Sequence, residues 1–271
     1  MPELPEVETV RRGIAPHVTT RRIVAVRVRE PRLRWPVPRR ITTELPGQVI
    51  RSVTRRAKYL LLAVDRGHLL IHLGMSGNLR VVPRSAPPQK HDHLDIELDS
   101  GACLRFRDPR RFGSVLFTTR PTERHRLLRA LGPEPLSDDF NGGYLHARSR
   151  GRRASIKAFL MDSHVVAGVG NIYASEALYR AGIHPARPAG RISRNRCDTL
   201  AGAVRDILLA AIGRGGSTLR DFVNEDGDPG YFVPQLTVYD RAGLPCGGCG
   251  RPISKRIIAQ RASYYCPGCQ R

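Results

Sequence analysis

Four cysteines near the C-terminus constrain the fold of this chain more than any other feature. They form two pairs in the spacing C-x2-C-x16-C-x2-C, and each pair lies in a tight turn, CGGC or CPGC. Thiolates in this pattern are typical ligands of tetrahedral Zn²⁺, and four protein ligands leave no open position for water. Two disulfides are the alternative, but the chain begins without an apolar signal segment, so we expect a reducing compartment. The pattern predicts a zinc ribbon that holds one structural Zn²⁺ through Cys246, Cys249, Cys266 and Cys269.

The chain is strongly basic. Its 271 residues include 45 Lys and Arg against 24 Asp and Glu, which gives a formal net charge of +21. Such a charge favours a polyanionic partner, and association with the ribosome explains it as well as DNA does. No apolar run is long enough to span a bilayer, and no apolar seam predicts oligomerisation. We therefore expect a cytoplasmic monomer without membrane contact.

The first half of the chain alternates in the manner of β-strands. The segment RRIVAVRVRE sets Val24, Val26 and Val28 against Arg27 and Arg29, and similar runs follow between DRG and DSG turns. One short helix precedes these runs, opened by a proline and apolar on one face, with Pro5, Val7, Val10 and Ile14. This half is predicted to be a mainly antiparallel sheet structure.

The second half is predicted to be helical. After the Pro/Gly-rich stretch GPEPLSDDFNGG, the apolar period changes to 3.6 residues in SIKAFLMD, NIYASEALYRAGI and CDTLAGAVRDILLAAIG. The remaining thiols, Cys103 and Cys197, stand alone in a predicted strand and a predicted helix, where we expect buried side chains. The predicted fold class is α+β. We divide the chain into a sheet domain (1–132), a linker (133–151), a helical domain (152–237) and the zinc ribbon (238–271).

The first residues, MPELPEVETVRRG, suggest a nucleophile. Removal of Met1 before a small residue would leave Pro2 as a free secondary amine. An N-terminal amine has a pKa of about 7.7 to 8, so part of it is neutral at pH 7 and can attack a carbonyl-like carbon to form an iminium. Glu3 beside it could move protons.

Motifs along the whole chain add to this signal. They are PELPEVET, HLGMSG, KHDH, DPRRFG, GVGNIYASE, GGSTLRDF and the terminal ribbon. Together and in this order they resemble the formamidopyrimidine-DNA glycosylase family of bacterial base-excision repair enzymes. The resemblance implies an N-terminal two-layer β-sandwich with flanking helices, followed by a helix-two-turn-helix bundle and the zinc ribbon. It also implies a duplex DNA partner that contains oxidised bases, and with it a bacterial, nucleoid-associated protein.

The resemblance assigns roles to residues that composition and periodicity leave undistinguished. Glu6 is implied to support the nucleophile, and Ser217 and Thr218 lie in the loop that closes over the everted base. Arg148, Arg150 or Arg153 could take the place of the matching Arg152. The implied catalytic residues are Pro2, Glu3, Lys58 and Arg261, and the side chains implied to fill the space left by the base are Met75, Arg110 and Phe112. The implied phosphate contacts are Lys58, His91, Arg110, Arg152, Asn171 and Arg261.

The implied activity is a bifunctional glycosylase and lyase for oxidised purines, which forms a Schiff base at Pro2 and then performs β,δ-elimination. Three alternatives remain at this point. One is an endonuclease VIII-like glycosylase for oxidised pyrimidines, and another is a non-catalytic DNA-binding protein with the same fold. The third is a ribosome-associated zinc-ribbon protein, which would leave the N-terminal motifs unexplained.

Overall fold

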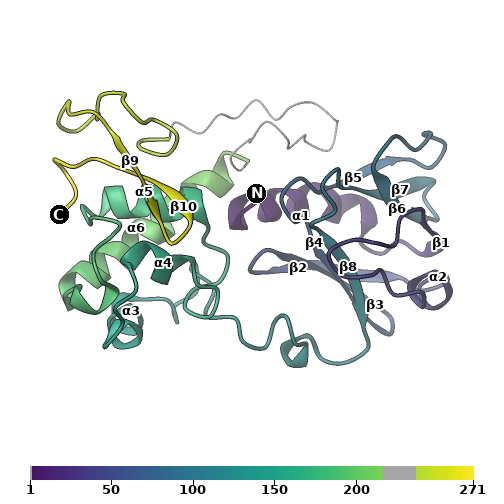
Figure 1. The fold of residues 1–271 in the computed structure, drawn as a ribbon. Helices are drawn as coiled ribbons and strands as arrows, with labels where there is room; N and C mark the ends of the chain where they lie inside the picture. The colour runs from purple at the N-terminus through teal and green to yellow at the C-terminus, as the bar shows by residue number, and fades with distance from the viewer. Residues whose placement is uncertain (1, 216–235) are drawn as a thin grey trace. The chain divides into compact units, whose positions relative to one another are not determined.

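A computed structural model describes residues 2–215 and 236–271 (Figure 1). Within these ranges the chain forms two compact units, which are described separately. The first comprises residues 2–129, and the second comprises residues 130–214 together with 236–271. The expected α+β class is confirmed, because strands dominate the first unit and helices the second.

The first unit is a β-sandwich of two four-stranded antiparallel sheets. Their strand orders are β1-β6-β7-β5 and β2-β3-β4-β8. The strands are β1 (Ile23–Val28), β2 (Ile50–Arg56), β3 (Tyr59–Val64), β4 (Gly67–His72), β5 (Asn78–Pro83), β6 (Asp92–Leu98), β7 (Ala102–Arg107) and β8 (Ser114–Thr118). The helical segments are α1 (Leu4–Val18), α2 (Ile41–Glu44) and the 3-10 turn η1 (Thr122–Arg124).

Helix α1 joins the two sheets. Its apolar face, with Val7, Val10 and Ile14, is buried as the sequence pattern predicted. The helix contacts β2 and β3 of one sheet and β5 and β7 of the other. Burial of one such aliphatic side chain stabilises a fold by about 1.5–3 kcal/mol, so this face fixes the first residues of the chain against the sandwich.

The expected alternation fails at one position of β1. Val24 is 41% exposed, whereas Ile23 and Val26 are buried. The register between β1 and β6 shifts between Ile23 and Ala25, which is the signature of a β-bulge. An extra residue turns the neighbouring side chain to the other face, so the simple period of two could not place Val24.

The second unit contains a helical bundle and a β-hairpin. Its elements are α3 (Gly142–Ser149), α4 (Ile156–Met161), α5 (Asn171–Arg180), the 3-10 turn η2 (Ala189–Arg191), α6 (Arg194–Gly213), β9 (Ser254–Ile258) and β10 (Arg261–Tyr265). Helix α6 contacts α3 and α5, and β10 contacts α5. Side chains cap three of the helices, since Asn141, Ser155 and Ser193 accept hydrogen bonds from the first turns of α3, α4 and α6.

The two isolated cysteines are buried, as expected. Cys103 is 1% exposed in β7 and Cys197 is 2% exposed in α6. Burial is the main reason why the pKa of the Cys103 thiol rises to about 12. Such a thiol stays protonated at neutral pH and is unreactive.

Candidate active site and metal centre

The first candidate group lies at the N-terminus of α1. Pro2 is buried, and Glu3 is 2% exposed. Glu3 and Glu6 form a capping box, in which the backbone N–H of each residue donates to the side chain of the other; the bond from Glu3 N to Glu6 Oε2 measures 2.7 Å. The box ties two carboxyl groups to the start of the helix, and Glu3 directly follows Pro2 in the chain.

Lys58 lies in the two-residue turn between β2 and β3. Ala57, which precedes it, has a φ of 53°, in the left-handed region. The neighbouring strand β4 ends at His72, whose ring lies 4.8 Å from the ring of Tyr59 between centroids. Burial, helped by the positive charges of Lys58 and Arg34, lowers the pKa of His72 to about 4. His72 is therefore neutral at pH 7, and its Nδ1 accepts the backbone N–H of Gly74 at 2.9 Å.

Met75, Arg110 and Phe112 lie in two neighbouring loops, residues 73–77 and 108–113, which we call the paired loops. Arg110 and Phe112 are exposed, and the guanidinium carbon of Arg110 lies 5.0 Å from the centroid of the Phe112 ring. Phe112 is 46% exposed, which is unusual for a large aromatic side chain. Met75 is half-buried. The first unit thus presents an apolar side chain and a cation on one pair of loops.

His91 precedes β6 and is half-buried. Its φ of 74° lies in the left-handed region, which is strained for a residue other than glycine. Its carbonyl oxygen accepts the backbone N–H of Asp108 at 3.1 Å, so the His91 turn is bonded to the second paired loop.

Asn171 and Arg261 lie in the second unit. Asn171 is the first residue of α5, and its Nδ2 donates to Ala262 O at 3.1 Å. Arg261 is exposed and opens β10, directly after a two-residue turn in which Ala259 and Gln260 have φ values of 47° and 60°. Positive φ at both positions is the geometry of a type I′ hairpin. The turn places Arg261 at the tip of the hairpin.

Two buried charged residues that the sequence analysis did not single out position this hairpin and the segment before it. Lys157 is 1% exposed, and its ammonium donates to Ala262 O at 2.8 Å and to Ser263 Oγ at 2.7 Å. Glu176, 6% exposed, accepts the backbone N–H groups of three successive residues, 237–239, at 2.8 to 2.9 Å. The available signal was a charged residue within each apolar helical pattern, but the sequence could not name its partners.

The arginines around Arg152 differ in their surroundings. Arg152 is exposed, as are Arg148 and Arg153. Arg150 is occupied within the fold, because its guanidinium donates to His146 O at 3.1 Å and to Ile192 O at 2.8 Å. Ser217 and Thr218, the expected residues of the loop over the base, lie outside the described residues.

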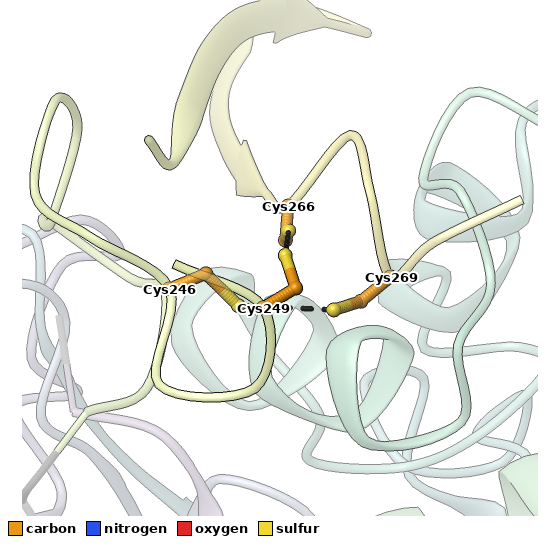
Figure 2. A group of neighbouring side chains, drawn as sticks. All are labelled: Cys246, Cys249, Cys266 and Cys269. Atoms are coloured by element: carbon orange, nitrogen blue, oxygen red, sulfur yellow. Dashed lines mark hydrogen bonds between the residues drawn. The ribbon is translucent and has the colours of Figure 1, made fainter. Parts of the chain in front are cut away.

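The four cysteines of the predicted ribbon converge on one point (Figure 2). Their sulfur atoms all lie within 4.8 Å of one another, and the Cys246–Cys269 and Cys249–Cys266 pairs are 3.8 and 3.4 Å apart. Thiolates bound to one Zn²⁺ at about 2.3 Å lie about 3.8 Å apart in a tetrahedron, whereas disulfide sulfurs lie about 2.05 Å apart. The donor set and spacing fit a metal ion and do not fit two disulfides.

Helix α5 also reaches the sulfur cluster. The Tyr179 hydroxyl lies 3.2 Å from Cys246 Sγ and can donate to the thiolate. The backbone N–H of Gly248 donates to the same sulfur at 3.4 Å. Hydrogen bonds of this kind fix the orientation of a metal ligand.

None of the described helices combines the length and the apolar composition that a bilayer-crossing segment needs.

Comparison with known proteins identifies the class. Residues 1–115 match the sequence model of the formamidopyrimidine-DNA glycosylase N-terminal domain, and residues 131–223 match that of the H2TH domain of the same enzymes. A β-sandwich with the predicted amine, an H2TH unit and a four-cysteine ribbon define a base-excision DNA glycosylase. The chain belongs to the formamidopyrimidine-DNA glycosylase family.

The relatives match over the full length. The chain is 60% identical to formamidopyrimidine-DNA glycosylases from Methylococcus capsulatus and from Syntrophotalea carbinolica, with all of each chain covered. Among solved structures, MutM (Fpg) from Thermus thermophilus is 40% identical with a TM-score of 0.88, covering 99% of this chain and 98% of that one. The Lactococcus lactis Fpg, solved with N7-benzyl-Fapy-dG DNA, is 34% identical with a TM-score of 0.91 and complete coverage of both chains. The expected family and the DNA glycosylase and AP lyase activity are confirmed.

Proposed function

We propose that this enzyme removes oxidised purines, namely 8-oxoguanine and formamidopyrimidines, from double-stranded DNA and uses Pro2 as its nucleophile. The observation that carries the proposal is the buried Glu3 carboxyl group beside Pro2 at the start of α1. Reaching a damaged base requires its eversion from the duplex, which costs a few kcal/mol. Insertion of Met75, Arg110 and Phe112 into the space left behind offsets this cost.

The reaction begins at the imino nitrogen of Pro2. Removal of Met1 is required, because an acylated nitrogen cannot form an iminium. The nitrogen attacks C1′ of the everted nucleoside, and the base leaves with the electrons of the glycosidic bond and takes up a proton. The nitrogen loses its own proton, and its electron pair opens the sugar ring while Glu3 protonates the ring oxygen. The product is a Schiff base between the protein and the deoxyribose.

Strand cleavage follows from this iminium. It acidifies the proton at C2′, whose removal expels the 3′ phosphate by β-elimination. A second proton loss, from C4′, expels the 5′ phosphate by δ-elimination and leaves a one-nucleotide gap. Lys58 supplies a proton in the first elimination and Arg261 in the second.

Trapping of the Schiff base tests the nucleophile. Borohydride added during the reaction with an 8-oxoguanine:cytosine duplex should yield a covalent complex whose modified peptide begins at Pro2. Glu3→Gln should abolish base release yet still trap an abasic site, where no base has to leave. Glu44→Gln, at an exposed position of α2, is the control and should leave both reactions unchanged. Capture at a lysine, or preference for thymine glycol opposite adenine, would contradict the proposal.

DNA binding is proposed to use the phosphate contacts expected from the sequence. The exposed Arg152 and Arg261 and the half-buried His91 and Asn171 support it. With five or six phosphate contacts, the logarithm of the affinity should fall against the logarithm of the salt concentration with a slope of roughly −5. A slope near −1 would mean that these residues do not hold phosphates.

The cysteine cluster is proposed to hold one structural Zn²⁺ through four thiolates. With this ligand set the ion stabilises the ribbon and leaves the reaction to the protein side chains. Native mass spectrometry should show one bound zinc, loss of Met1 and a monomer. We keep the functional division into a catalytic domain (1–132), a linker (133–151), an H2TH domain (152–237) and a ribbon (238–271).

A further inference from the structure

We infer that Asp108 is a positioning residue that holds the paired loops and the His91 turn in one arrangement. The inference rests on the proposed function, because it concerns the side chains that would enter the DNA. Asp108 begins the second paired loop, and its side chain is fully buried. None of the roles assigned above uses it.

The carboxylate of Asp108 bridges the two paired loops. Its Oδ1 accepts the hydroxyl of Ser76 at 2.7 Å and the backbone N–H of Arg110 at 3.3 Å. Its Oδ2 accepts the backbone N–H of Gly113 at 2.7 Å. These donors neighbour the expected DNA-contacting residues on both loops, since Ser76 follows Met75 and Gly113 follows Phe112. One carboxylate therefore fixes the backbone on either side of the inserted residues.

The backbone of Asp108 extends the arrangement to the His91 turn. Its N–H donates to His91 O at 3.1 Å, and its carbonyl oxygen accepts His93 Nε2 at 2.7 Å. The same carbonyl accepts the N–H of Arg111, whose φ of 56° is left-handed. Left-handed backbone at a non-glycine residue persists only when its surroundings hold it, and both His91 and Arg111 are bonded to Asp108.

Close backbone contact makes the arrangement specific. A Cβ atom placed on Gly74 would lie 2.4 Å from the backbone of both Phe112 and Gly113. A Cβ on Gly113 would lie 2.7 Å from His72 O. The loops can meet in this way only when their backbones stay in register. The Asp108 carboxylate is a polar link across that contact, beside a direct bond in which the N–H of Arg110 donates to Ser76 Oγ at 3.2 Å.

Such a link matters for eversion more than for the covalent chemistry. Ordering flexible loops on binding consumes part of the interaction energy, so preformed loops insert at lower cost. Attack by Pro2 on an abasic aldehyde in single-stranded DNA needs neither eversion nor contact with a partner strand. Loss of the link should therefore slow excision from duplex DNA while leaving reaction with a single-stranded abasic site intact.

The test compares these two reactions in Asp108→Asn. An amide has one acceptor oxygen and cannot accept all three hydrogen bonds, because its NH₂ group meets either the Gly113 N–H or the Arg110 N–H. We expect single-turnover excision of 8-oxoguanine from a duplex to fall about 10- to 100-fold. Borohydride trapping on a single-stranded abasic oligonucleotide should stay within about twofold of wild type. Ser76→Ala, a milder change, should lower excision less and also spare trapping.

Asp95→Asn is the matched control for general destabilisation. Asp95 is a buried carboxylate of the same unit, 3% exposed, that pairs with Arg105 at 2.9 Å and with Arg29. Its replacement should lower both reactions equally or not at all. Parallel loss of both reactions in Asp108→Asn and Ser76→Ala, as in Asp95→Asn, would overturn the inference and leave the proposed function standing. Failure of the wild-type enzyme to excise 8-oxoguanine would overturn the proposed function itself.

Discussion

Replacement of Glu176 by glutamine should loosen the segment that leads into the cysteine ribbon. Glu176 Oε1 accepts the N–H groups of Val238 and Tyr239 at 2.9 and 2.8 Å, and Oε2 accepts that of Thr237 at 2.8 Å. Glutamine offers one acceptor oxygen, so at least one backbone N–H would face an NH₂ group. The change keeps the size of the side chain and removes its charge.

The magnitude follows from these three bonds. A hydrogen bond to a charged group contributes about 1.5–3 kcal/mol, and a neutral acceptor is roughly half as strong. Thr237 is exposed, so its N–H can bond to water in the variant, which reduces the loss. We expect a net local destabilisation of about 2–3 kcal/mol, equivalent to a 30- to 150-fold rise in local opening.

Hydrogen exchange measured by mass spectrometry checks this prediction. The amides of residues 237–239 should exchange faster by that factor, while the β3–β4 hairpin of the first unit keeps its protection. Asp198→Asn, which removes the same charge from an exposed pair with Arg194, is the control. A change below about threefold at residues 237–239, or an equal rise throughout the chain, would refute the reasoning.

Three further predictions concern other contacts. The unfolded chain binds a proton at His72 more tightly than the folded chain, so the free energy of unfolding should fall by about 3 kcal/mol as the pH drops from 6.5 to about 4. His72→Gln should remove this part of the pH dependence of the free energy of unfolding, measured by denaturant titration at each pH. The same pH dependence in the variant and the wild type would contradict the prediction. Tyr179→Phe removes the hydrogen bond to Cys246 and should speed the release of zinc to a chelator about tenfold. Equal release rates in the variant and the wild type would contradict this prediction. Gly74→Ala should destabilise the protein more than Gly101→Ala in thermal unfolding, because both glycines have positive φ but only Gly74 has backbone within 4 Å of the added Cβ. Equal losses would mean that the loop contact is loose.

The sequence predicts local features of this fold well. The helical period over NIYASEALYRAGI corresponds to α5, and the spacing of the cysteines correctly predicts their convergence. Both signals depend on residues that are near in sequence or on ligand types with few alternatives. The exposure of Val24 could not be predicted, since a bulge depends on the pairing of β1 with β6, about 70 residues away.

In the candidate site, too, some features can be predicted from the sequence and others cannot. The motifs single out Pro2 and the paired loops, and their roles stay predictions from the family resemblance. The buried contacts of Lys157 and Asp108 were not foreseen. Lys157 bonds to residues 105 and 106 positions away, and Asp108 bonds to Ser76 across 32 positions. A single sequence indicates that a charged residue lies in an apolar pattern, but only the fold shows which distant group satisfies it.

The contact between the paired loops also has an evolutionary consequence. A one-residue insertion in either loop would displace the other, because the backbone at Gly74 and at Gly113 is in close contact with the neighbouring segment. Length changes should therefore be inherited in both loops together or in neither. At the exposed turn of Gly101 nothing lies within 4 Å of an added Cβ atom, so a change of length there meets no neighbouring segment. Related genes should therefore differ in length at that turn while the paired loops keep a constant length.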